Sequence, residues 1–122
     1  MKVTNNEPQG KVPQQVHDLE GVLSDAQTGK GSRGLSASEL EMILPVIAVR
    51  GLYIPAMECY QRETENNWPL RMDLSLFWEE PETAIDTGRA KTESMEVVRE
   101  ILEKIRMEGK KVAVLIWLDD SA

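Results

Sequence analysis

The spacing of apolar residues predicts structure most clearly in the last third of the chain. Apolar side chains recur at helical intervals over residues 92–108, which predicts a helix that ends near Gly109. Residues 111–118 are almost continuously apolar and include β-branched side chains, which predicts a central strand covered on both faces. Over residues 70–78 apolar and other side chains alternate, which predicts another strand.

Weaker patterns predict the earlier elements. Apolar spacing favours a helix over residues 14–26, and two overlapping capping boxes that begin at Ser36 and Ser38 announce a second helix over 36–44. Pro45 is expected to end that helix. Residues 46–49 fit either a short buried strand or part of a broken helix, and residues 28–34 have the glycine-rich composition of a flexible loop.

A further helix is expected over residues 55–65, because Pro55 suits the first position of a helix. The predicted fold is therefore α+β, with a small sheet of about three strands packed against three to four helices. Segments 70–78, 92–108 and 111–118 form a candidate β-α-β unit at the C-terminus if the strands are parallel, and antiparallel pairing is the alternative.

The domain organisation expected from the sequence is simple. Residues 1–13 hold too few apolar side chains to offset the entropy of ordering them, so they are predicted to be a disordered tail. Residues 14–122 are predicted to form a single domain, since this length is typical of one hydrophobic core. The open edges of a small sheet favour pairing between two copies, which is compatible with a homodimer.

Cysteine content and hydropathy bear on the cellular environment. Cys59 is the only cysteine, so the chain can form no internal disulfide, which fits a reducing cytoplasm. No apolar run is long enough to span a membrane, and the first twelve residues lack the features of a secretion signal. We therefore expect a soluble cytoplasmic protein that folds without a cofactor.

Charge is distributed unevenly along the chain. The formal net charge is −7, and residues 35–82, with nine acidic and three basic side chains, account for −6 of it. A negative field of this kind repels nucleic acid and acidic membranes and favours encounter with basic partners. The simpler interpretation is that acidity only keeps the protein in solution.

Few residues suggest catalysis. Glu79, Glu80 and Glu82 follow one predicted strand and Asp119 and Asp120 follow another, so parallel strands would gather carboxylates that could bind Mg²⁺. Solvated acidic turns are the competing interpretation. The glycine pattern at 29–34 lacks the preceding strand that a dinucleotide site needs, and the sole histidine, His17, has no evident catalytic partner. We assign no catalytic residue and no metal ligand.

The leading hypothesis is a non-enzymatic protein-binding module that engages a basic surface of a partner protein. Its profile is that of an inhibitor, immunity or accessory protein, such as those of mobile elements. One alternative is a Mg²⁺-dependent phosphoryl or phosphodiester enzyme that uses the sheet-edge carboxylates. A second is a structural subunit of a larger assembly such as a virion. The candidate partner-binding residues are Glu63, Glu65, Trp68, Glu79, Glu80 and Glu82.

Overall fold

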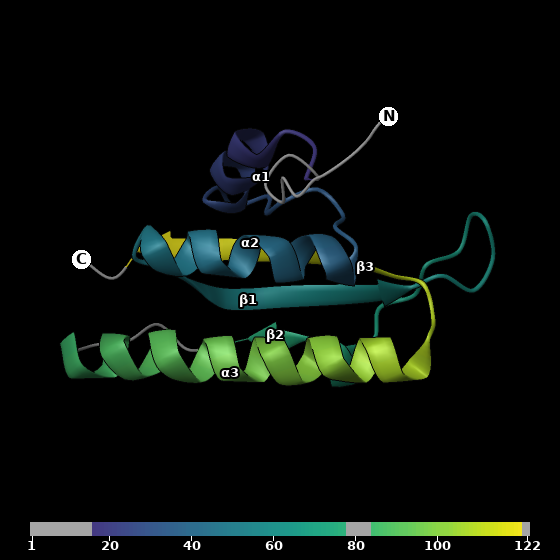
Figure 1. The fold of residues 1–122 in the computed structure, drawn as a ribbon. Coiled ribbons are helices and arrows are strands. Elements are labelled where there is room, and N and C mark those ends of the chain that lie inside the picture. The colour runs from purple at the N-terminus through teal and green to yellow at the C-terminus, as the bar shows by residue number, and fades with distance from the viewer. Residues whose placement is uncertain (1–15, 78–83, 121–122) are drawn as a thin grey trace, which may run out of the picture.

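One antiparallel sheet packed against helices gives the protein an α+β fold (Figure 1). The computed structural model describes residues 16–77 and 84–120, so the predicted tail at 1–13 lies outside the described residues. The elements follow in the order α1 (Leu19–Ala26), α2 (Ala37–Val49), β1 (Leu52–Gln61), the 3₁₀ helix η2 (Met72–Leu74), β2 (Leu76–Phe77), α3 (Ala84–Glu108) and β3 (Val112–Asp120).

The three strands lie in the order β2-β1-β3, with β1 antiparallel to both neighbours. Strands β2 and β3 therefore run parallel to each other, and β2, α3 and β3 form the predicted β-α-β unit. Its two strands are not adjacent, because β1 lies between them. The expectation that the C-terminal strand is central was wrong, since β1 holds that position while β3 pairs over its length with β1.

The outer edge of β3 is partly occupied by the segment that precedes α2. The Ser32 amide donates to the Ile116 carbonyl at 2.9 Å, and Leu35 and Val114 exchange two backbone hydrogen bonds of 2.8 and 2.7 Å. The glycine-rich stretch at 28–34 is thus a loop, as predicted, but backbone hydrogen bonds fix its end to the sheet. These bonds occupy backbone groups at the edge of β3 that could otherwise pair with a strand of another molecule.

The sheet has two unlike faces, because side chains alternate along each strand. The covered face consists of Met57, Cys59, Leu76, Val112, Val114 and Ile116, all of which are buried. Helices α2 and α3 contact each other as well as β1, so both lie against this face. The open face consists of Ala56, Glu58, Tyr60, Phe77, Ala113, Leu115 and Trp117, none of which is buried. No described helix packs across the open face, while α1 lies beside α2 towards the β3 edge (Figure 1).

The predicted helix over 55–65 was wrong, because residues 52–61 form β1. Pro55 does not begin a helix but lies where the register with β3 shifts, between Tyr53 and Ala56. Proline has no amide hydrogen to donate to a neighbouring strand, so an irregularity of this kind is one of the few places where an inner strand accepts it. Pro55, which was predicted to begin a helix, therefore lies at an irregularity in a strand.

Helix α2 also departs from the prediction, because Pro45 lies inside it and the helix continues to Val49. The proposed strand at 46–49 is therefore helical. Pro45 is exposed, whereas Ile47 is fully buried and continues the apolar stripe of Leu40 and Ile43. Burial of that stripe outweighs the missing backbone hydrogen bond. Of the two predicted capping boxes the first is confirmed, since Ser36 and Glu39 each bind the other's backbone amide, whereas Ser38 lies inside the helix.

The predicted strand over 70–78 is largely wrong. Residues 72–74 form η2, and of the described part of this segment, residues 70–77, only Leu76 and Phe77 belong to a strand. The alternation of apolar residues predicted one buried face. Met72 is 64% exposed and Leu70 is 39% exposed, so these side chains do not form such a face. Two other boundaries moved: α1 begins at Leu19 after the Asp18 cap, and α3 begins at Ala84, eight residues before the predicted start.

Candidate partner-binding loop

Residues 62–69, which we call the acidic loop, extend beyond the end of the sheet after β1 (Figure 1). The loop contains three of the six partner-binding residues proposed from the sequence. Glu63 and Glu65 are exposed, and Trp68 is half-buried. The fold therefore brings two carboxylates and an aromatic side chain together in one projecting segment. The other three candidates, Glu79, Glu80 and Glu82, lie outside the described residues.

Backbone hydrogen bonds give the acidic loop a defined shape. Thr64 and Asn67 donate to each other's carbonyls at 3.3 and 3.2 Å, and the Glu63 amide donates to the Asn67 carbonyl at 2.9 Å. The Asn67 side chain donates to the Glu63 carboxylate at 3.2 Å. Together these bonds close a tight turn, so the carboxylates project from an ordered support. A binding segment that is ordered beforehand loses less conformational entropy when it meets a partner.

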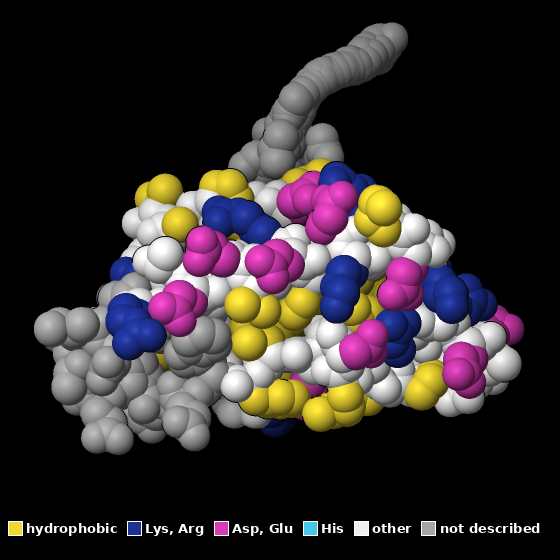
Figure 2. Space-filling view, turned by 90° about the horizontal axis from the view of Figure 1, so that it is seen from below, with side chains coloured by type: hydrophobic (Ala, Val, Ile, Leu, Met, Phe, Trp, Pro, Cys, Tyr) yellow, Lys and Arg dark blue, Asp and Glu magenta, His cyan; other side chains and the backbone are white. Residues whose placement is uncertain are grey.

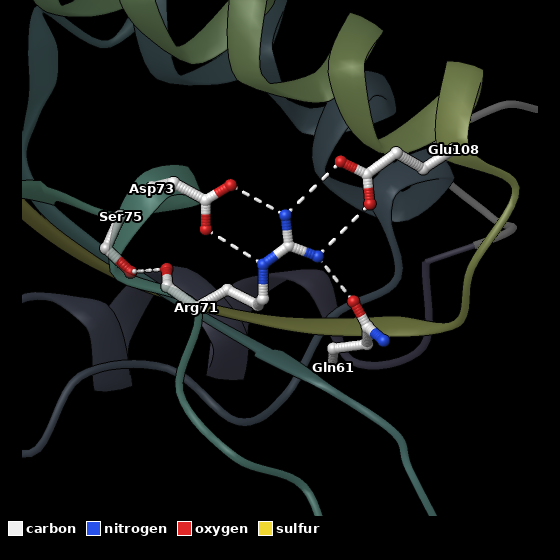
Figure 3. A network of polar contacts seen from close by, with 5 residues as sticks. All are labelled: Gln61, Arg71, Asp73, Ser75 and Glu108. Atoms are coloured by element: carbon white, nitrogen blue, oxygen red, sulfur yellow. Dashed lines mark hydrogen bonds and ion pairs between the residues drawn. The ribbon is translucent and has the colours of Figure 1, made fainter.

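The base of the loop is fixed by the guanidinium group of Arg71 (Figure 3). Arg71 donates to both carboxylate oxygens of Asp73 at 2.8 and 2.6 Å and to both of Glu108 at 3.1 and 3.2 Å, and it also contacts the Gln61 side chain. These bonds connect the chain after the loop to the end of β1 and to the end of α3. Bidentate pairs of this kind fix orientation as well as contributing energy.

The same network changes the acidity of its members. Hydrogen bonds from Arg71 lower the pKa of the Asp73 and Glu108 carboxyl groups below their ordinary values. Conversely, hydrogen bonds to Asp73 and Glu108 raise the pKa of Arg71. All three groups therefore stay charged near neutral pH, which keeps the base of the loop fixed.

The described acids of residues 35–77 do not gather on one surface. Glu39 and Glu41 lie on α2, Glu58 lies on β1 and Asp73 lies on η2. Glu39 pairs with Arg33 at 3.4 Å and Asp73 pairs with Arg71, which offsets part of the negative charge. On the side of the molecule seen in Figure 2, acidic and basic side chains are interspersed. In the acidic loop, by contrast, no described basic side chain forms an ion pair with Glu63 or Glu65.

The remaining chemical candidates stay without an assigned role. Asp119 and Asp120 were expected to follow the last strand but are the final two residues of β3. Within 16–77 and 84–120 no three His, Cys, Asp or Glu side chains are placed to hold one metal ion. Burial raises the pKa of the Cys59 thiol to about 12, which keeps it protonated and poorly nucleophilic. His17 is exposed. In the same described ranges, no helix is long and apolar enough to cross a membrane.

Sequence reasoning missed the residues that support the loop and those that line the open face. Arg71 was not singled out, because nothing in its neighbourhood shows that Glu108, 37 positions away, meets it. Glu58 and Tyr60 were assigned to a helix, although their alternation with buried Met57 and Cys59 is the signal of a strand with one exposed face.

Comparison with models of known protein families gives no match, and comparison with curated proteins gives no significant match.

Proposed function

We propose that this protein is a non-enzymatic binding module whose acidic loop engages a basic surface of a partner protein. The observation that carries the proposal is the projection of Glu63 and Glu65 from an ordered turn, without a described basic partner of their own. An inhibitory, immunity or accessory role, as found among proteins of mobile elements, would suit such a module. The proposal draws on the local charge of the loop and not on an acidic face of the whole molecule.

The geometry favours recognition by encounter followed by a short-range contact. Carboxylates at the tip of a projecting segment attract a basic surface over a distance of about one Debye length, about 8 Å at physiological ionic strength. Trp68 lies in the same loop, and tryptophan is among the side chains that contribute most to protein interfaces. The Arg71 network keeps the base of the loop fixed, so the charged tip is held in one orientation relative to the sheet.

The proposal is tested by affinity capture with the full chain as bait, in lysate of the cells that produce it. The test variant is Glu63→Lys combined with Glu65→Lys, which reverses the charge of the loop. The matched control is Glu96→Lys combined with Glu100→Lys, which makes the same charge change at two exposed positions of α3. Circular dichroism would confirm that both variants fold.

We expect a captured partner to bind the wild type and the α3 control equally, and to bind the loop variant at least about tenfold more weakly, as is typical when one partner of an interface charge pair is changed. Raising the salt concentration should lower the association rate for the wild type but have less effect on the loop variant. Equal binding by the wild type and the loop variant would reject the proposal.

A further inference from the structure

The open face of the sheet has an unusual composition for a surface in contact with water. An antiparallel sheet with one solvated face normally carries polar residues on that face. Here the only charged side chain among the seven positions is Glu58. The other six are apolar or aromatic: Ala56, Tyr60, Phe77, Ala113, Leu115 and Trp117. Phe77, at the β2 edge, is 57% exposed.

Glu58 lies at the centre of this face. It is on β1, the middle strand, where it pairs with Leu115 of β3, and Ala56 and Tyr60 flank it on its own strand. Its carboxylate accepts a hydrogen bond from the Tyr60 hydroxyl at 2.7 Å, and this bond raises the pKa of Tyr60. Both side chains are half-buried, and no described basic side chain forms an ion pair with Glu58. A single carboxylate thus lies among apolar and aromatic neighbours.

The aromatic side chain on the β3 side is held in place before any partner arrives. The Trp117 indole donates a hydrogen bond to the Gly29 carbonyl at 3.2 Å. Its ring lies so close to Gly31 that a Cβ atom there would come within 2.6 Å of Trp117 Cε2. A contact residue that is already fixed loses little side-chain entropy on binding. The loop over 28–31 therefore acts as a support for one side of the face.

We propose that the open face is a second docking surface, for a protein segment that presents a lysine or arginine from within an apolar patch. The apolar side chains would cover the partner's apolar groups, and the cation would pair with Glu58. Once a partner covers the face and water is excluded from it, a charge pair at the centre is stronger than it would be on an exposed surface. Arginine and aromatic side chains are enriched among the residues that contribute most to interfaces, and the contacts around such residues exclude water.

Charge also decides between this partner and a second copy of the chain. In a back-to-back dimer related by a two-fold axis near the middle of the face, Glu58 would meet Glu58 of the other copy. Two carboxylates brought together and desolvated repel each other, and neither would gain a cation. A partner with a central cation satisfies the same position. The inference rests on a surface different from the acidic loop, so it does not depend on the proposed function.

The test uses the full chain and a display library of random peptides. Peptides are selected on the wild type and counter-selected on a variant in which Glu58→Gln is combined with Phe77→Thr. We expect the retained peptides to share a lysine or arginine flanked by apolar residues. For such a peptide, Glu58→Gln should weaken binding at least about tenfold, and so should replacing the peptide's cation by citrulline or norleucine.

Two control variants separate this surface from others. Met107→Thr removes an apolar side chain that is 77% exposed on α3, and Glu65→Gln removes one carboxylate from the acidic loop. Neither should change peptide binding, and circular dichroism would confirm that all variants fold. Loss of binding with Glu65→Gln but not with Glu58→Gln would overturn the inference while supporting the proposed function. Retained peptides without a basic residue would also overturn it, as would a dimer in analytical ultracentrifugation that Phe77→Thr dissociates.

Discussion

The covered face and the open face of the sheet are formed by the same strands but differ in burial, and therefore in how much each contributes to stability. On β3, Ile116 is fully buried against the helices, while its neighbour Leu115 points to the opposite side and is only half-buried. Both are large aliphatic residues in a run that looks uniform in the sequence. The difference shows that half of an apolar strand can hold the fold together while the other half remains accessible for contacts with other molecules.

The largest expected effect comes from shortening neighbouring side chains on the two faces. Ile116→Ala should lower the free energy of unfolding by about 2–5 kcal/mol, because it leaves a cavity in the core. Leu115→Ala should cost less than about 1 kcal/mol, because water can fill the space that it leaves. Urea denaturation of both variants measures the contrast. Similar losses for the two would mean that the open face is covered as well.

A smaller effect is expected at the support of Trp117. Gly31 has φ 76°, in the left-handed region, and lacks space for a Cβ atom, so Gly31→Ala should cost about 2–3 kcal/mol. Gly51 has φ 72° with open space around it, so Gly51→Ala should cost only the backbone strain of about 1–2 kcal/mol. Gly29→Ala, with no atom within 4 Å of the new Cβ, is the neutral control. Equal costs at Gly31 and Gly51 would show that contact with the indole does not matter.

The Arg71 network on the side of the covered face predicts a pH-dependent contribution to stability. Because folding lowers the pKa of Asp73 and Glu108, their contribution is fully present above their ordinary values of 3.8 and 4.5. It is lost as the pH falls through their lowered values in the folded state. Arg71→Gln should therefore destabilise the protein at neutral pH, with a loss that shrinks towards pH 2.

This pH dependence is measured by denaturant unfolding at a series of pH values, with Arg99→Gln as the control. Arg99 is an exposed arginine of α3 for which the described residues provide no ion pair. Its replacement should leave the shape of the stability profile unchanged. A stability difference between the wild type and Arg71→Gln that stays constant from pH 2 to pH 7 would contradict the assigned role of the network.

The smallest effect is expected at Phe77. Its ring is more than half exposed at the edge of the open face, so Phe77→Thr, which keeps a β-branched strand residue, should change stability by no more than about 0.5 kcal/mol. Thermal unfolding followed by circular dichroism measures this. A loss near that of Ile116→Ala would place Phe77 in the core and remove it from the proposed docking surface.

The elements predicted correctly are those whose patterns come from local chemistry. The stripe of α3 and the apolar run of β3 are long enough to identify a helix and a strand, and the Ser36 capping box fixed the start of α2. The errors arose where tertiary contacts decide. Pro45 and Pro55 were both taken as helix boundaries, but packing of Ile47 continues α2, and a shift in register accommodates Pro55 within β1.

The candidate surfaces were predictable only in part. Charge counting identified Glu63 and Glu65, because they belong to a block of the chain with nine acidic and three basic side chains, and Trp68 stood out as an aromatic residue in a connection. It could not show that Arg33 and Arg71 pair with other acids of the same block, since those pairs depend on the fold. The open face was hidden for a similar reason: three of its seven residues come from β1, where Pro55 and the spacing of Glu58 and Arg62 favoured a helix.

The position of β1 between β2 and β3 has a consequence for the order of synthesis. Cys59 and Val114, which are paired partners, lie 55 positions apart, whereas within the described chain β2 pairs with β1 through two residues, Leu76 and Phe77. A ribosome releases β1 long before β3. The apolar side chains of α2 and β1 in the nascent chain therefore stay exposed until α3 and β3 have been synthesised. We expect the sheet to form late, and the unfinished chain to be a client for chaperones during translation.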